Sequence, residues 1–526
     1  MTDATTGFVR IPNRGIITAC TMAATLMQAL DSTIANVALP YMQGSLSASY
    51  DEITWVLTSY VTAAAIMTAP VGWLASRFGR KNLFLICVIG FTIASMLCGA
   101  AQSLEQMVLF RILQGVFGAA LVPLSQSTML DIYPAEQRGS AMALWGVGVM
   151  LGPILGPTLG GFLTEWYNWR WVFYVNLPVG VAATLGLLWF MPKSQSQSGL
   201  RFDWIGFAVL SIGIGCLQMM LDRGQDQDWF SSREIIVEAV LAGLGFYLFV
   251  VHMATARNPF IKAAVFRDRN LLAGVLMMFA VGSVLLASSA LLAPWLQTLS
   301  DYPVAAAGLL LAPRGIGTMA AMMVGGRLSG RLDPRLIMFV GLLILIYSMW
   351  IMTGWTPDVS RWEVIFCILL QGAGLGFVFV PLQVLAFWTL PAQFRTDGTA
   401  LLSLFRNVGS AIGISVMSAT LAHNTQVLHQ EIGGAITPFN RALQVGGSVG
   451  QYWIIAPVPG SPVTAKQGLA MLDHVVNRQA EIIAYVDDFK LMMLTTVPAI
   501  LFLLLLRRPR VLRPASPDDH HAAVMD

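Results

Sequence analysis

Apolar residues fill long, regularly spaced windows of this chain. Each window holds about 20 residues with almost no charge, the length that an α-helix needs to cross the hydrocarbon core of a bilayer. Polar and charged residues gather in the short segments between the windows. The pattern therefore predicts an all-α, polytopic membrane protein with fourteen transmembrane helices. The windows lie near residues 15–38, 53–75, 82–101, 107–130, 141–163, 171–191, 203–222, 234–255, 271–296, 305–325, 335–354, 362–387, 398–421 and 490–507.

The amino-acid composition agrees with this prediction. Of the 526 residues, 56% are hydrophobic and 11% are charged, which leaves too little polar surface to cover a soluble protein of this size. The first window is too long for a removable signal peptide, so we expect it to remain as the first span. All five cysteines lie in apolar windows and no histidine lies in the middle of one, so we expect no disulfide framework and no metal site.

Lys and Arg residues are distributed unevenly between the two sides of the predicted helices. With the amino terminus inside, 20 of the 31 fall on the cytoplasmic side, 8 fall outside and 3 lie within spans, namely Arg111, Arg314 and Arg406. Because basic residues beside spans are retained in the cytoplasm, this distribution predicts that both termini are cytoplasmic. The same bias accounts for the net charge of +3, which therefore gives no reason to expect nucleic-acid binding.

The two halves of the chain resemble each other weakly. GWLASRFGRK (72–81) aligns with GRLSGRLDPR (326–335) at a shift of 254 residues, and QGVFG from Gln114 aligns with QGAGLG from Gln371 at a shift of 257. Such repeats are typical of transporters built from two bundles around a central site. We therefore predict two six-helix bundles separated by a two-helix insertion. The predicted domains are 1–192, 193–269 and 270–526, the last with an external loop at about 422–489.

Five segments resemble motifs of a known family. They are LDSTIANVALP (30–40), GWLASRFGRKNL (72–83), RILQGVFGAALVPLSQ (111–126), GVGVMLGPILGPTLGGF (146–162) and LQMMLDRGQDQDWFSSREII (217–236). The family is the major facilitator superfamily, and within it the fourteen-span drug/proton antiporters of the EmrB/QacA type, especially the EmrB branch. The resemblance implies an inner-membrane antiporter that exports lipophilic compounds in exchange for protons and needs no cofactor. It also implies an EmrA-type periplasmic adaptor and a TolC-type outer-membrane channel as partners.

The loop after the second predicted span carries the first candidate conformational motif. Gly72 and Gly79 permit a tight turn and close helix contact, and Arg77 and Arg80 lie where basic residues are retained. The family's acidic residue is absent from this loop. We expect Asp131, at the end of the fourth span, to replace it as the partner of Arg77 or Arg80.

The fifth predicted span carries the second candidate motif. Four glycines recur at intervals of four residues, so they share one helix face and allow a neighbouring backbone to approach closely. Two prolines remove backbone donors and favour a bend. We expect this face to serve helix packing, a specific role in antiport, or both, as a tight seam between the halves. The residues are Gly148, Gly152, Gly156, Gly160, Pro153 and Pro157.

Asp31 interrupts the first apolar window. A charged side chain within a span costs about 2.5–3.5 kcal/mol on insertion scales, so it persists mainly where it has a function. An alternative is that Asp31 lies close enough to the outer end to reach water. We predict that Asp31 binds the coupled proton, with Arg111 as its electrostatic partner. Gln28, Gln114 and Arg406 are the candidate lining residues of the substrate cavity.

No motif indicates ATP-driven transport or enzymatic catalysis, since the chain lacks GxxxxGK[ST], HExxH and GxSxG sequences. The sequence therefore predicts a secondary active transporter for small lipophilic substrates. Three arginines within spans against one clear acid favour neutral or weakly acidic amphipaths over dications. Two alternatives stay open. One is an exporter of the same fold that is dedicated to a metabolite or siderophore, and the other is a transporter-like membrane sensor.

Overall fold

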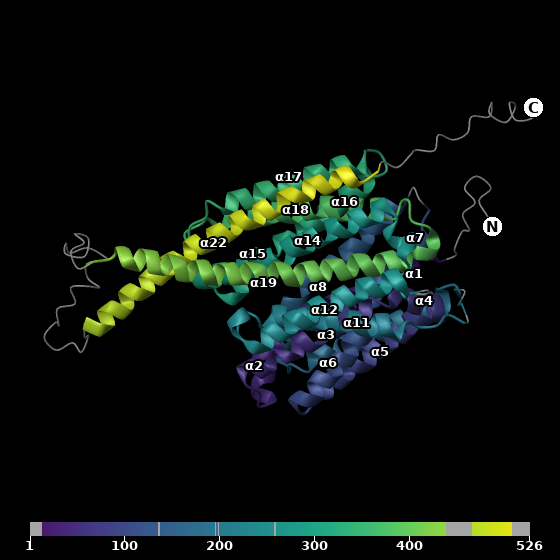
Figure 1. The fold of residues 1–526 in the computed structure, drawn as a ribbon, viewed down its shortest axis with the longest axis horizontal. Helices are drawn as coiled ribbons and strands as arrows, with labels where there is room; N and C mark the ends of the chain where they lie inside the picture. Colours follow the sequence, from purple (N-terminus) through teal and green to yellow (C-terminus); the bar gives the residue numbers. More distant parts are fainter. Residues whose placement is uncertain are drawn as a thin grey trace, which may run out of the picture.

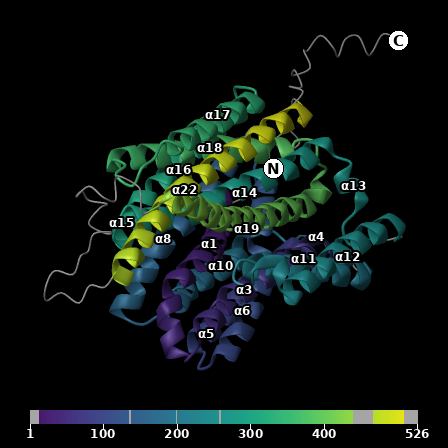
Figure 2. The same ribbon diagram turned by 60° about the vertical axis from the view of Figure 1, so that its left-hand side comes forward.

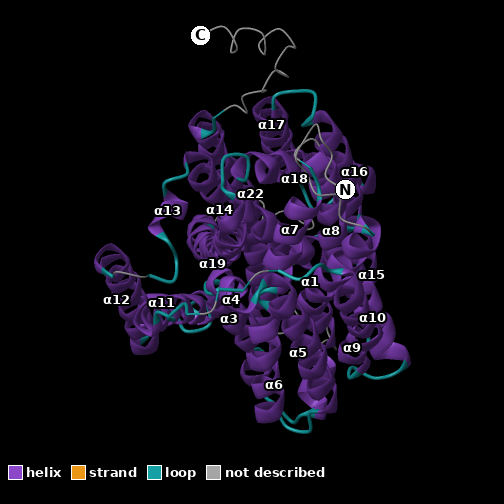
Figure 3. Ribbon diagram, turned by 90° about the vertical axis from the view of Figure 1, so that its right-hand side faces the viewer, coloured by secondary structure: helices purple, strands orange, loops and turns teal. Residues whose placement is uncertain are grey.

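Helices make up the described part of this chain. The computed structural model describes residues 13–134, 137–194, 196–197, 199–256, 259–437 and 465–507, and these ranges contain no strand (Figure 3). The helices are α1 (Arg14–Ser45), α2 (Tyr50–Ile53), α3 (Trp55–Thr68), α4 (Val71–Phe78), α5 (Arg80–Ala100), α6 (Leu104–Gly118), α7 (Leu121–Ile132), α8 (Arg138–Trp166), α9 (Trp171–Tyr174), α10 (Asn176–Phe190), α11 (Trp204–Arg223), η2 (Trp229–Ser231), α12 (Arg233–Thr255), α13 (Ala263–Phe266), α14 (Arg269–Pro294), η3 (Trp295–Leu299), α15 (Val304–Leu311), α16 (Pro313–Leu328), α17 (Pro334–Met352), α18 (Arg361–Ala386), η4 (Ala392–Phe394), α19 (Arg395–Ala435) and α22 (Ala465–Leu505). The predicted all-α class is confirmed.

The predicted spans coincide with long helices. In the described ranges, twelve helices are long and apolar enough to cross a membrane, and the pair α3–α4, bent by 60°, would make a thirteenth. The first predicted span, 15–38, lies in the 32-residue helix α1, which is not among them because hydroxyl, amide and carboxyl side chains interrupt its apolar residues. The multi-pass architecture is confirmed, and the exact count of fourteen stays a prediction.

The helices associate mainly within the halves of the chain. In the first half, α1 packs against α8, α10 and α7; in the second, α14 packs against α19, α18 and α22. Between the halves in sequence, α11 and α12 pair with each other, and α11 also lies against α3 and α19 (Figures 1 and 2). The predicted domain boundary at 192 falls between α10 and α11, and the boundary at 269 meets the first residue of α14.

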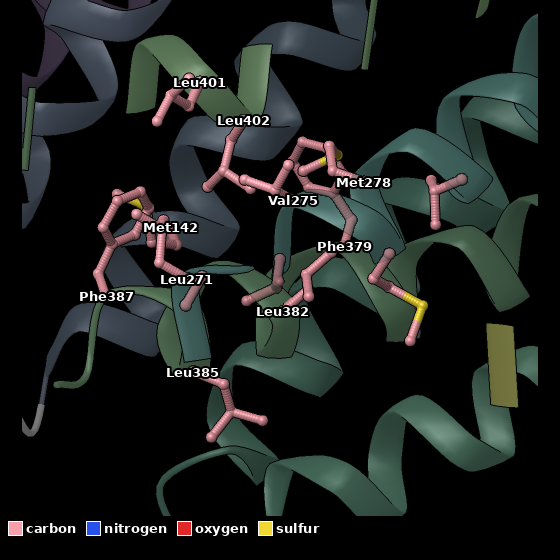
Figure 4. Packing of buried hydrophobic residues seen from close by; sticks show 14 of the residues in the cluster. Met142, Leu271, Val275, Met278, Phe379, Leu382, Leu385, Phe387, Leu401 and Leu402 are labelled. Carbon is pink, nitrogen blue, oxygen red and sulfur yellow. The ribbon is translucent and has the colours of Figure 1, made fainter. Parts of the chain in front are cut away.

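An apolar cluster joins the two halves at one end of the molecule. We call this the terminal end, because α1 begins and α22 ends there (Figure 1). Trp145 of α8 stacks on Phe379 of α18, with their ring centroids 6.2 Å apart. In Figure 4, Met142 of α8 lies close to Leu271 of α14 and to Phe387, the residue that follows α18. Burial of these side chains from both halves stabilises the closed arrangement of this end.

At the opposite end, the buried apolar residues form two separate clusters. One cluster lies within the first half and includes Leu30, Ile34, Val56, Cys98 and Phe173. The other lies within the second half and includes Leu291, Trp295, Met349, Val364 and Phe489. Each cluster contains residues from its own half alone. The halves therefore share an apolar core at the terminal end and keep distinct cores at the other.

Two helices extend into the segment that we predicted to be an external loop. Helices α19 and α22 each contain 41 residues, about 60 Å of helix at 1.5 Å per residue, which is about twice the hydrocarbon thickness of a bilayer. Their far ends project beyond the other helices (Figure 1). Within the predicted loop at 422–489, the described residues before 436 and from 465 onward are helical, and residues 438–464 lie outside the described ranges.

Candidate functional site

Helix α1 carries Asp31 in a segment where several hydroxyl side chains form hydrogen bonds with the backbone of the same helix. The hydroxyls of Thr18, Thr25 and Ser32 donate to backbone carbonyls one turn earlier in α1, at 2.8–3.0 Å. Such bonds let hydroxyl residues lie in an apolar helix without a partner from elsewhere. A carboxylate has no hydrogen to donate when it is ionised, so Asp31 must take its partners from neighbouring helices.

Asp31 binds Arg111 of α6. Arg111 Nη1 donates to Asp31 Oδ2 at 2.8 Å, and both side chains are fully buried. Arg111 Nε donates to the carbonyl oxygen of Val56 in α3, at 3.0 Å. The guanidinium also lies over the ring of Tyr60, 4.2 Å from its centroid. A buried charge pair of this kind is favourable only with such additional partners, because both ions have lost their water.

Two amide side chains complete the surroundings of the Asp31 carboxylate. Gln114 Nε2 donates to Asp31 Oδ1 at 2.8 Å, and its own Oε1 accepts from Arg111 Nη1 at 2.8 Å. Asn176 Nδ2, at the start of α10, donates to Asp31 Oδ1 at 3.3 Å and to Ser95 Oγ of α5 at 3.0 Å. We call Asp31, Arg111, Gln114, Asn176 and Ser95 the carboxylate cluster. It links four helices around one titratable group.

The structure brings some predicted site residues together and separates others. Asp31 and Arg111 are in contact as expected, but Asp31 does not reach water at the outer end, because it is fully buried. Gln114 was expected to line the substrate cavity; instead it is fully buried within the carboxylate cluster. Gln28 is half-buried and donates to the Tyr60 hydroxyl at 3.3 Å. Arg406 is half-buried in α19.

Sequence reasoning missed three residues of this site. Tyr60, Ser95 and Asn176 lie far apart in the chain and meet only after the helices pack. Asn176 left a usable signal, since it is a lone amide in the apolar window 171–191 and such side chains need a partner in a membrane. Ser95 left none, because a serine in an apolar helix can bond its own backbone.

The glycine face of α8 packs against α1, within the same half. A Cβ atom on Gly152 would lie 2.5 Å from Ala29 Cβ, and one on Gly160 would lie 2.9 Å from Ile34 Cγ1. The expected seam between the halves is therefore wrong for this face. Gly148 and Gly156 also lie against α1 residues, so the face serves helix packing within the first half. Helix α8 continues through Pro153. The side chain of Pro157 lies outside the described part.

Other residues of α8 form the contact between the halves. A Cβ atom on Gly139 would lie 2.6 Å from the carbonyl oxygen of Gly326 in α16. Gly146 likewise faces Met322, and Ile154 faces Gly315, both also in α16. One face of α8 thus contacts α1 while another contacts the second half. Helix α8 therefore lies between α1 and α16 of the second half.

Charged residues join the halves at the terminal end. Asp131 of α7 forms ion pairs with Arg80 of α5 and with Arg395 of α19, the latter at 2.5 Å. The expected contact between Asp131 and Arg80 is present; of the two candidates, Arg77 does not appear among the ion pairs of the described residues. Gly79 adopts φ 81° between α4 and α5, a conformation that favours glycine. Gly72 leaves room for the side chain of Asp397.

The ion pairs of Asp131 lead to a first prediction. Asp131→Asn removes the charge that holds Arg80 and Arg395 together, so the two guanidinium groups repel each other and the terminal end opens more readily. We expect slower transport and faster labelling of a cysteine introduced at Ser329, beside this seam. Asp226→Asn, at an exposed position far from the seam, is the matched control. Unchanged labelling and transport in Asp131→Asn would contradict a role in closure.

Comparison with known proteins assigns the chain to a family. Residues 21–414 match the model of the Major Facilitator Superfamily. The chain belongs to this superfamily. Relatives include the multidrug export protein EmrB of Haemophilus influenzae, 35% identical over 81% of this chain and 84% of that protein, and the fatty acid resistance protein FarB of Neisseria gonorrhoeae, 33% identical over 89% and 90%.

Solved structures of superfamily members share the fold. The human organic anion transporter MFSD10 aligns with a TM-score of 0.58 over 92% of this chain and 100% of that chain, at 15% sequence identity. At this identity the similarity shows the fold alone. Membership of the superfamily makes this chain a multi-pass secondary transporter, as predicted, and the carboxylate cluster is then a buried titratable site inside a transporter.

Proposed function

We propose that this chain exports lipophilic compounds of several kinds across the inner membrane in exchange for protons. The observation that supports proton coupling is the fully buried ion pair between Asp31 and Arg111. Burial of a carboxylate in a membrane protein is energetically costly, so such a residue persists mainly where it has a function. In transporters, intramembrane carboxylates mark proton pathways. The multidrug export proteins among the relatives supply the substrate class.

The contacts of Asp31 suggest how a proton would drive the change of conformation. In the present arrangement the ionised carboxylate accepts hydrogen bonds from Arg111, Gln114 and Asn176. Protonation cancels the attraction to Arg111 and turns one acceptor oxygen into a donor. The hydrogen bonds through which Asp31 holds α1 to α6 and α10 are then weakened, while α1 still packs against α8. Helix α8 carries the shift to the seam with the second half.

The present conformation corresponds to one side of the transport cycle. The positive-inside distribution supports a cytoplasmic location for the terminal end, and the shared apolar core and the Asp131 ion pairs would then close the cytoplasmic side. The separate cores at the other end leave the outer side free to part. We therefore propose a state closed toward the cytoplasm, in which Asp31 takes up a proton from outside only after the outer side opens.

Membrane topology is tested with reporter fusions. We expect fusions after Arg201, Arg223 and Arg257 to report inside, outside and inside, because α11 and α12 are each long and apolar enough to cross the membrane. Arg257 itself lies outside the described residues. Fusions placed after Lys81 and after Arg170 provide the control, since they flank spans of the first bundle. An inside signal after Arg223 would show that the inserted pair does not span.

An EmrA-type periplasmic adaptor and a TolC-type outer-membrane channel are the proposed partners. The projecting parts of α19 and α22 offer the surface on which an adaptor could dock, since they extend beyond the other helices at the proposed outer end (Figure 1). Co-purification with an adaptor encoded beside this chain would support the assembly. Full efflux to the medium from cells that lack every adaptor would refute it.

Drug export is tested by efflux from cells and by transport in everted vesicles. Cells that express the protein should accumulate less of a panel of lipophilic dyes and antimicrobials, and vesicles should move these compounds when a pH gradient is imposed. Collapse of the gradient should stop transport. Export of a single metabolite with no effect on the panel would replace multidrug export by the dedicated exporter of the same fold.

A further inference from the structure

Arg314 of α16 is a half-buried guanidinium whose described contacts include no carboxylate. Its Nη1 donates to Ser289 Oγ, and its Nη2 donates to Ser288 Oγ at 3.1 Å; both serines belong to α14. Nη2 also donates to Gln371 Oε1 of α18. In the described part of the chain, no Asp or Glu forms an ion pair with Arg314. The positive charge of Arg314 is thus left without a counter-charge.

Two N–H donors at this position have no acceptor. Arg314 Nε and Gln371 Nε2 are buried and lack a hydrogen-bond partner among the described residues. Gln371 is fully buried. A buried donor without an acceptor carries the full cost of its lost hydration, and a guanidinium carries more. Two orphan donors around an unpaired cation make a site that is short of an acceptor with negative charge.

The internal repeat sharpens this interpretation. Gln371 corresponds to Gln114 at a shift of 257 residues, and Arg314 corresponds to Tyr60 at the shift of 254. Each half therefore places a guanidinium against the buried glutamine at this position of the repeat: Arg111 against Gln114 in the first half and Arg314 against Gln371 in the second. In the first half Asp31 supplies the anion. In the second half two serine hydroxyls take that place, and no carboxylate of the described residues pairs with Arg314.

The site lies beside the contact between the halves. Gly315, next to Arg314 in sequence, faces Ile154 of α8 in the first half. Arg314 and Ser289 retain partial exposure, whereas Asp31 and Arg111 have none. Arg314 is therefore partly accessible beside the contact between the halves, whereas the carboxylate cluster is not.

We propose that Arg314, Gln371, Ser288 and Ser289 bind the carboxylate of an exported lipophilic acid. This inference rests on the proposed export function and names its substrate class. The planar fork of a guanidinium matches the two oxygens of a carboxylate, and the orphan Nε and amide N–H groups supply further donors. The acyl chain would extend between the apolar surfaces of the two halves.

Ligand binding to the full chain in nanodiscs of neutral lipid tests this site. The probes are dodecanoate and 1-dodecanol, which share one alkyl chain and differ in charge. We expect dodecanoate to bind at least about tenfold more tightly, the usual contribution of charge-assisted hydrogen bonds. Arg314→Gln should reduce this preference to less than about twofold, and Arg314→Lys should retain part of it, because charge without the fork recovers only part of the contact.

Gln371→Glu is the second variant, and it guards against a folding defect. The new side chain gives Arg314 an internal carboxylate, as Asp31 does for Arg111. The fold should therefore stay intact, while dodecanoate should no longer bind more tightly than 1-dodecanol. Arg233→Gln, an exposed position on α12, controls for the loss of one positive charge. An unchanged preference in both Arg314→Gln and Gln371→Glu would overturn the proposal, as would a wild type without preference.

Two further measurements separate the possible outcomes. Raising the chloride concentration should leave the preference for dodecanoate unchanged; its loss in chloride would assign the site to an inorganic anion and overturn the lipophilic acid. Transport of a neutral dye driven by a pH gradient tests the export function separately. Dye export by a protein that shows no preference for dodecanoate would contradict the Arg314 site alone. A preference for dodecanoate without any export would contradict the proposed function.

Discussion

Vesicles that contain Asp31→Asn should lose export driven by a pH gradient and fall to the level of vesicles without the protein. Asparagine keeps the shape of the side chain but has no proton to take up or release, so binding and conformational change are no longer linked to the gradient. We expect the variant to bind substrate as before. Transport rates at imposed pH gradients measure the effect, and substrate binding to the purified variant measures the retained step.

The same substitution also removes the charge that compensates Arg111. Breaking one partner of a buried ion pair costs about 3–5 kcal/mol, so Asp31→Asn should unfold at a lower temperature than the wild type. The double variant Asp31→Asn with Arg111→Gln removes both charges and should recover most of that stability, still without transport. This pair of variants separates lost coupling from lost folding. Retained pH-driven export in either one would rule out Asp31 as the coupling residue.

Local patterns in the sequence were enough to predict the helices and part of the site. Hydropathy identifies apolar windows because each span must bury itself in lipid regardless of its neighbours. Asp31 and Arg111 could be paired in advance, since each was a charge within a span and each needed a partner. Asp131 could be expected near Arg80 for a different reason, since the loop that carries Arg80 lacks the family's acidic residue and Asp131 is a carboxylate at the end of the fourth predicted span.

Features that depend on packing between helices were beyond the sequence. Gln114 lies within a span, but only the angle of α6 against α1 decides whether its side chain faces a cavity or Asp31. The glycine face of α8 indicated close packing without indicating which helix it meets. The ends of α19 and α22 were expected to be loop because they are polar, yet polar residues also form helices in water when helices support each other.

Gly152→Ala should destabilise the protein and stop transport, because it adds an atom where α8 touches α1. The new Cβ would lie 2.5 Å from Ala29 Cβ, 2.6 Å from the Ala29 carbonyl carbon and 2.8 Å from the Leu30 backbone nitrogen. Two of these three atoms belong to the backbone, so a rotamer change in α1 cannot relieve the clash. Overpacking of this kind costs about 1–3 kcal/mol, and the shift of α1 that relieves it also moves Asp31 away from Arg111.

Gly161→Ala on the same helix is the matched control for this prediction. A Cβ atom there meets nothing within 4 Å, and alanine favours a helix over glycine by about 1 kcal/mol, so the control should be as stable as the wild type or slightly more stable. Adding Ala29→Gly to Gly152→Ala removes one of the three close contacts and should restore part of the loss. Thermal unfolding of the purified variants and pH-driven transport measure both effects. If Gly152→Ala matched Gly161→Ala in both measurements, tight contact between α8 and α1 would not be what keeps Asp31 in place.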